Sequence, residues 1–192
     1  AGMSQDSSRK AYDFLKSMGV DVQFGKMVTD YRDHKVIMKD GTEIPTRTFL
    51  WVSGIRANAM PGISDDHMGR GFRFKVDQFN RIPGLDGVFA IGDQCLQTTD
   101  AAYPNGHPQV AQVAIQQAKN LAKNLKKINE GQDDSTLTAF KYNNLGSMAT
   151  IGRNKAVVEI GKFRSQGFFA WILWLVVHLR SILGVKNKMM VL

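Results

Sequence analysis

Apolar and polar residues alternate along the chain in patterns that predict a mixed α/β fold. Residues 4–20 repeat apolar side chains at helical spacing, and Gly19 marks the end of the predicted helix. The candidate N-terminal caps of this helix are Asp6, Ser7 and Ser8. The first segment is therefore expected to be a helix with one apolar face.

Four further segments have strand patterns. Residues 20–25 alternate apolar and polar positions, and residues 35–45 indicate a hairpin with an Asp-Gly turn. Residues 48–55 and 87–92 are continuous apolar runs, as in strands that are buried on both faces of a sheet. The pattern thus predicts two buried strands in addition to the hairpin.

The rest of the chain alternates between irregular segments, a long helix and short strands. Residues 56–81 are glycine-rich and irregular, whereas residues 108–128 have a strong helical pattern with Pro108 at its first position. The apolar stripe predicted for this helix comprises Val110, Val113, Leu121, Leu125 and Ile128. After a polar linker, residues 137–152 and 155–161 are expected to pair as strands.

A carboxylate stands directly after the second apolar run, in the pair Gly92 and Asp93. The carboxyl ends of strands in an open α/β sheet face the ligand crevice, so Asp93 is suited to accept a hydrogen bond from a ligand hydroxyl. Gly92 would permit close approach of that ligand, and the next helix would direct its positive end to the same region. Small residues along that helix are Ala111, Ala114, Ala118 and Ala122. The alternative is an ordinary turn followed by alanines that merely favour the helix.

The charge of the chain is basic and concentrated toward its C-terminal end. The net charge of the 192 residues is +8, and residues 151–192 contain seven basic residues against Glu159 alone. This excess suggests an anionic partner, either lipid or nucleic acid. Because the basic residues are interleaved with Trp and Leu, we expect no nucleic-acid binding. The single cysteine, Cys95, excludes an internal disulfide and fits a reducing compartment.

The apolar segment at residues 168–183 is the strongest candidate for membrane contact. Residues 168–177 carry no charge, yet this run is shorter than the ~20 residues needed to span a bilayer. Tryptophans within the run and basic flanks predict a helix in the interface of an anionic membrane. The predicted membrane-contacting residues are Phe168, Trp171, Trp174, Arg180, Lys186 and Lys188. The alternative is a helix buried against its own domain or in a homodimer.

Several segments together resemble the C-terminal part of a type II NADH dehydrogenase, a flavoprotein of the pyridine nucleotide-disulfide oxidoreductase superfamily. They are TFLWVSGI, RIPGLDGVFAIGDQC, YPNGHPQVAQVAIQQAKNLAKNL, GSMATIGRNKAVVEI and GFFAWILWLVVHL. The resemblance implies an α/β fragment of a protein with two Rossmann-like dinucleotide-binding domains and a C-terminal apolar helix. It assigns residues 1–50 to the end of the NADH-binding domain, 51–130 to the FAD-binding domain, and 131–192 to a membrane-associating region.

The resemblance also implies roles for individual residues. Those expected to bind FAD are Gly92, Asp93, Ala111, Gln112, Val113 and Ala114. Those expected near the quinone are Gln112, Gln116, Tyr103 and Pro104. No residue has the pattern of a dedicated catalytic nucleophile, and no metal site is expected. We interpret His107 as a residue that leads into the helix.

The implied activity is electron transfer from NADH through FAD to a membrane quinone, without proton pumping. The implied location is peripheral, at the cytoplasmic side of a bacterial inner membrane. The family carries two G-x-G-x-x-G turns and this chain contains neither, so we interpret it as a C-terminal fragment. We expect the fragment alone to bind neither FAD nor NADH well and to be inactive.

Two alternatives remain open. One is a related flavin-dependent quinone reductase of the sulfide type. That chemistry needs cysteines near the flavin, and the presence of Cys95 alone argues against it. The other is a non-enzymatic module that binds membranes.

Overall fold

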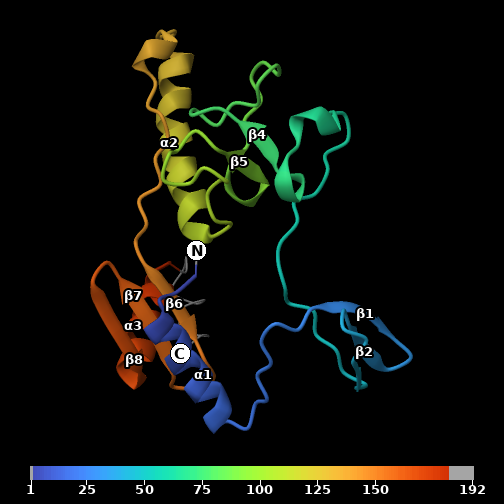
Figure 1. Cartoon of the computed structure of the whole chain (residues 1–192). Helices are drawn as coiled ribbons and strands as arrows, with labels where there is room; N and C mark the ends of the chain where they lie inside the picture. Colours follow the sequence, from blue (N-terminus) through green and yellow to red (C-terminus); the bar gives the residue numbers. More distant parts are fainter. Residues whose placement is uncertain (1, 182–192) are drawn as a thin grey trace. The chain divides into compact units, whose positions relative to one another are not determined.

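The computed structural model describes residues 2–181, which form two compact units (Figure 1). One unit joins the N-terminal segment up to Trp51 to the C-terminal segment from Leu145 onward. The other unit is Val52–Asn144. The functional assignment of residues 1–50, 51–130 and 131–192 stays a prediction.

The first unit begins with the predicted helix, α1 (Gln5–Ser17). The side chain of Ser4 caps it by accepting a hydrogen bond from the Ser7 N–H at 3.4 Å. The predicted caps, Asp6, Ser7 and Ser8, are wrong because these residues already lie inside the helix. Gly19 has a φ of +79°, which confirms that the helix ends where the glycine permits a left-handed turn.

A three-stranded antiparallel sheet follows, made of β1 (Val28–Arg32), β2 (Lys35–Met38) and β3 (Glu43–Pro45). The predicted hairpin is confirmed, and Gly41 in its turn has a φ of +83°. The strand predicted at residues 20–25 is wrong, since the first strand begins at Val28. Phe24 is 77% exposed, so the alternating pattern there has no apolar surface against which to pack.

The strand predicted at residues 48–55 is also wrong. The segment has no strand structure, and Leu50 and Val52 are 79% and 91% exposed. A strand that is apolar on both faces is stable only between neighbouring strands and covering helices. Nothing among residues 2–181 pairs with this segment in a sheet.

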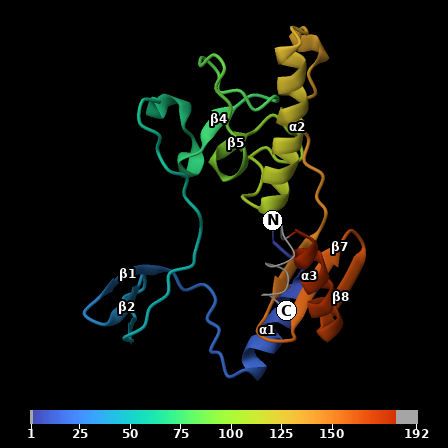
Figure 2. The same cartoon turned by 180° about the vertical axis from the view of Figure 1, so that it is seen from behind.

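The C-terminal part of the first unit is a second antiparallel sheet with a helix packed on it (Figure 2). Its strands are β6 (Ser147–Thr150), β7 (Ala156–Ile160) and β8 (Phe163–Gly167). The predicted pairing of two strands is confirmed for β6 and β7, whereas β8 was not predicted because FRSQG is mostly polar. Helix α3 (Phe168–Ser181) packs Ala170 against Ala156 and Val158 of β7.

Helix α1 is tied to the same sheet through one carboxylate on β7. Glu159 accepts hydrogen bonds from the Ser4 N–H at 3.1 Å, from the Ser4 hydroxyl, and from the Ser7 hydroxyl at 2.6 Å. These donors hold the pKa of Glu159 below its usual range. A carboxylate at the positive end of α1 also interacts favourably with the helix dipole.

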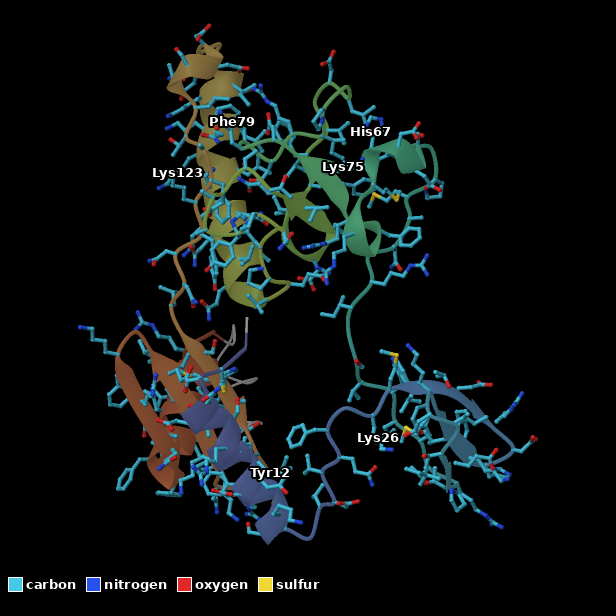
Figure 3. The ribbon with its side chains drawn as sticks, viewed as in Figure 1. Tyr12, Lys26, His67, Lys75, Phe79 and Lys123 are labelled. Carbon is cyan, nitrogen blue, oxygen red and sulfur yellow. The ribbon has the colours of Figure 1, made fainter. Side chains whose placement is uncertain are left out.

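The second unit surrounds a pair of parallel strands, β4 (Phe74–Val76) and β5 (Cys95–Gln97). Lys75 lies on β4 (Figure 3), and its side chain donates a hydrogen bond to the carbonyl of Asp66 at 3.0 Å. The apolar core around the two strands comprises Met68, Phe74, Val76, Ile82, Ala90 and Cys95. The presence of β4 corrects the prediction that residues 56–81 are irregular throughout.

Three other predictions for the second unit differ from the structure. Residues 87–92 form no strand, and only Phe89 makes a single bridge, to Arg81. The long helix, α2 (Ala111–Asn129), starts after Pro108, with Val110 as its N-cap residue. Its buried side also differs from the predicted apolar stripe, because the buried residues are Val113, Gln117 and Asn124.

Candidate functional site

The Gly-Asp pair lies in a 3-10 turn, Gly92–Gln94, that leads into β5 rather than out of a strand. Gly92 has a φ of +64°, and a Cβ atom placed there would lie 3.1 Å from the Cβ of Ala114 on α2. Its N–H donates to the side-chain oxygen of Gln117 at 2.7 Å. The close approach that requires glycine is therefore made by helix α2.

Asp93 stands at the surface of this turn. Its side chain is exposed, and its backbone carbonyl accepts a hydrogen bond from Gln109 at 3.0 Å. Helix α2 begins nearby at Ala111, and the side chain of its N-cap residue, Val110, makes no capping hydrogen bond. An exposed carboxylate beside an uncapped helix start offers an acceptor for hydroxyl groups and donors for anions.

Cys95 is held in the core by two amide side chains. Its thiol is buried and accepts hydrogen bonds from Asn80 at 3.5 Å and from Gln117 at 3.4 Å. Burial raises the pKa of the Cys95 thiol, which disfavours the reactive thiolate. The geometry indicates that Cys95 is a packing residue of the core.

One face of α2 carries a ladder of side-chain amides, spaced one helical turn apart, at Gln112, Gln116, Asn120 and Asn124. Gln116 donates to the Asn143 carbonyl at 2.9 Å and accepts from the Asn143 N–H at 3.0 Å. Asn124 does the same with Thr138, at 2.9 Å in both directions. The ladder therefore fixes residues 137–144, which run alongside α2 in both ribbon views (Figures 1 and 2).

At the first rung of the ladder, Tyr142 donates its hydroxyl hydrogen bond to the Gln112 side-chain oxygen at 3.1 Å. The Tyr142 ring is packed against the rings of Tyr103 and His107, with centroids 5.4 and 6.0 Å away. Burial raises the pKa of Tyr142, so its hydroxyl stays protonated at neutral pH. Two residues predicted to lie near the quinone, Tyr103 and Gln112, are thus connected through Tyr142.

His107, whose ring contacts both tyrosines, forms a pair with Asp100. The His107 Nε2 atom is 3.0 Å from an oxygen of Asp100, and the two side chains are only 3% and 11% exposed. The contact with His107 lowers the pKa of Asp100. The buried guanidinium of Arg73 donates to the backbone carbonyl of His107 at 3.1 Å. His107 is thus a fixed core residue rather than only a lead into the helix.

The other predicted site residues are distributed over both units. On the second unit, Pro104 and Ala111 are exposed, whereas Val113 is buried. On α3, Phe168 and Arg180 are exposed, and Trp171 is partly buried against the sheet. Trp174 stacks on His178 with centroids 4.1 Å apart. Lys186 and Lys188 lie outside the described residues.

Sequence reasoning missed the residues that hold the site together. Asp100, Tyr142 and Arg73 carry no recognisable motif, because their partners come from distant parts of the chain. The amide ladder did leave a signal, since Gln and Asn recur at every fourth residue of the predicted helix. Among residues 2–181 there is no group of His, Cys, Asp and Glu that would hold a metal, and no helix able to cross a membrane.

The chain belongs to the pyridine nucleotide-disulphide oxidoreductase family, because residues 1–118 match the model of that family. Residues 144–192 match the model of the NDH2 C-terminal domain. The type II NADH:quinone oxidoreductase Ndh of Mycobacterium tuberculosis is 36% identical over 182 residues, which cover 91% of this chain and 38% of that protein. The chain thus spans well under half the length of this relative.

A plant relative and two solved structures extend the comparison. The mitochondrial internal alternative NAD(P)H-ubiquinone oxidoreductase A1 of Arabidopsis thaliana is 31% identical, covering 91% of this chain and 36% of the relative. The NDH2 structure from Plasmodium falciparum in complex with NADH matches with a TM-score of 0.82 and 16% identity, over 97% of this chain and 53% of that one. The sulfide:quinone oxidoreductase from Aquifex aeolicus has a TM-score of 0.68 and 15% identity, over 96% and 46%. These findings confirm the predicted resemblance and fold class.

Proposed function

We propose that the chain forms the C-terminal part of an FAD-dependent NADH:quinone oxidoreductase that works at a membrane surface. The observation that carries this proposal is the match of residues 144–192 to the NDH2 C-terminal domain. It is supported by the 36% identity to an NADH:quinone oxidoreductase that extends over 91% of the chain.

The residues at the Gly-Asp turn fit a bound FAD. Asp93 is exposed and suited to accept a hydrogen bond from a ribityl hydroxyl, and the start of α2 has no side-chain cap. FAD would supply the chemistry, by accepting a hydride from NADH and delivering two electrons to a quinone, which takes up two protons. The chain would bind and orient this cofactor through Asp93 and the first turn of α2, and would face the quinone with Gln112.

The membrane part of the proposal rests on helix α3. While Ala170 packs on the sheet, Phe169 and Val176 are 82% and 56% exposed, and Phe168 and Ile172 are also exposed. A water-soluble surface rarely presents so many large apolar side chains on one short helix. With Arg180 exposed at its end, α3 fits an interfacial helix that lies against anionic lipid.

A sulfide-type quinone reductase is the weaker candidate. The sulfide:quinone oxidoreductase structure matches the chain with a TM-score of 0.68, which is lower than the 0.82 of the NDH2 structure. Cys95 is the only cysteine, and its thiol is buried with a raised pKa. A thiol in that environment disfavours the reactive thiolate and is poorly suited to redox chemistry at a cysteine.

The test is reconstitution of activity. The chain is co-expressed with the portion of the Mycobacterium tuberculosis relative that lies outside the matched residues, and the complex is purified with FAD. NADH oxidation with a short-chain quinone is then measured, with the complete relative as the positive control. We expect quinone-dependent oxidation. A complex that associates and holds FAD but reduces no quinone would contradict the proposal.

The same complex tests the role of Asp93. Asp93→Ala removes the exposed acceptor and is expected to lower the FAD content of the purified complex by about tenfold, as loss of a charged hydrogen bond would. The matched control is Asp86→Ala, which removes another exposed aspartate of the same unit. Equal flavin content in Asp93→Ala and Asp86→Ala would remove Asp93 from the binding site.

A further inference from the structure

Tyr142 is held in place from three directions. Its backbone N–H approaches the Asp100 carboxylate at 3.5 Å, and its ring contacts Tyr103 and His107. The next residue, Asn143, is bound through both backbone groups by Gln116. The position of the Tyr142 hydroxyl is therefore set by packing and by hydrogen bonds on both sides of the backbone.

The hydroxyl of Tyr142 meets a side chain that the proposed function places at the quinone. It donates to the Gln112 oxygen at 3.1 Å, and Gln112 lies in the first turn of α2. A carboxamide has an acceptor on one side and two donors on the other. The hydrogen bond from Tyr142 engages the oxygen and therefore favours the orientation of the carboxamide in which that oxygen faces Tyr142.

We propose that Tyr142 is a positioning residue for quinone reduction, which acts by fixing the carboxamide of Gln112. This inference rests on the proposed function. Tyr142 itself touches neither quinone nor flavin in this proposal. The Asp100–His107 pair and Arg73 act indirectly, because they hold the loop against which Tyr142 packs.

The experiment measures two half-reactions in the reconstituted complex by stopped flow: flavin reduction by NADH and flavin oxidation by quinone. Tyr142→Phe keeps the ring and removes only the hydroxyl. We expect it to slow flavin oxidation by quinone about threefold to tenfold, the effect of losing one hydrogen bond. Flavin reduction by NADH should change less than about twofold, because Gln112 faces the quinone in this scheme.

A double-mutant cycle separates positioning from a general structural role. Gln112→Ala alone is expected to slow flavin oxidation by about tenfold or more. If Tyr142 acts through Gln112, then adding Tyr142→Phe to Gln112→Ala slows this step by less than about twofold further. The matched control is Tyr31→Phe, which also removes a hydroxyl hydrogen bond, the one to the Thr46 carbonyl at 3.2 Å. It should leave flavin oxidation by quinone unchanged.

The outcomes distinguish the inference from the proposed function. If the unsubstituted complex is reduced by NADH but passes no electrons to quinone, the proposed function fails and the inference fails with it. If that complex is active, the inference alone is overturned by any of three results. These are equal slowing of both half-reactions, no slowing in Tyr142→Phe, or a full additive effect in the double variant.

Discussion

Helices α2 and α3 differ in the kinds of side chain that they bury and expose. α2 buries Gln117 and Asn124, each of which hydrogen-bonds another part of its own unit. α3 buries the small residue Ala170 and leaves large apolar residues such as Phe169 exposed. A helix that buries polar groups fixes its surroundings, because each group must find a partner. A helix that exposes apolar groups offers a surface to something outside the described residues.

The largest expected effect concerns the buried amide of α2. Gln117→Leu keeps the approximate size of the side chain but leaves the Gly92 N–H without its partner at 2.7 Å. It also removes a donor to Cys95. We expect the free energy of unfolding of the chain to fall by about 2–3 kcal/mol, which denaturant titration would measure.

The control for this variant is Gln132→Leu, the same substitution at an exposed site beyond α2. It should change the free energy of unfolding by less than about 0.5 kcal/mol. A comparable fall in the free energy of unfolding in both variants would mean that the hydrogen bonds of the buried Gln117 side chain contribute no specific stability.

The difference between the two helices explains what the sequence predicted and what it did not. The extent of α3 and its apolar surface followed from local pattern alone, since FFAWILWLVV has no polar face. The extent of α2 was predicted to within a few residues, but its buried face was not. Hydrophobic spacing assigns Leu125 to the core, yet Leu125 is 42% exposed and Asn124 is 1% exposed. The partner of Asn124 is the backbone of Thr138, which no local pattern identifies.

Among the strands and at the site, too, features set by local sequence were predicted and features set by distant partners were not. The hairpin at residues 35–45 was predicted because its turn chemistry is local. The apolar run at residues 48–55 failed as a strand because its stability depends on neighbours that residues 2–181 do not supply. At the site, the Gly-Asp pair and the glutamines were recognisable by family resemblance. Tyr142, Asp100 and Arg73 were not, because only the tertiary fold brings them to Gln112 and His107.

A second prediction concerns the exposed apolar surface of α3. Phe169→Ser removes a side chain that is 82% exposed, so the folded chain loses little packing. If α3 lies in a lipid interface, partitioning of the chain onto anionic vesicles should fall by about tenfold, from the apolar area that no longer enters the membrane. The free energy of unfolding in water should change by less than about 0.5 kcal/mol.

The matched control is Phe163→Ser on β8, where the phenylalanine is 55% exposed but lies outside α3. It should leave vesicle partitioning nearly unchanged. Equal losses in the two variants would show that binding follows total exposed apolar area and not the surface of α3. Absence of binding by the unsubstituted chain would remove the membrane role of α3.

The smallest expected effect depends on pH and concerns the pair formed by Asp100 and His107. The pKa of Asp100 is lowered, chiefly by the hydrogen bond from His107 and also by backbone donors. A carboxylate with a lowered pKa in the folded state stabilises the protein above its unfolded pKa of about 3.9. That contribution is lost as the pH falls through the folded value. Asp100→Asn should therefore reduce the free energy of unfolding by about 1 kcal/mol at pH 7.

The difference in the free energy of unfolding between Asp100→Asn and the unsubstituted chain should narrow as the pH falls below about 4 toward the lowered pKa of folded Asp100. In this range the unfolded chain takes up a proton at Asp100 before the folded chain does, so the advantage of the folded carboxylate is lost. Thermal unfolding measured from pH 7 to pH 3 would follow this difference, with Asp86→Asn as the control for an exposed aspartate. A difference that stays constant over this range would mean that the charge of Asp100 contributes nothing to holding His107. In that case the loop against which Tyr142 packs would be fixed by ring packing and by Arg73 alone.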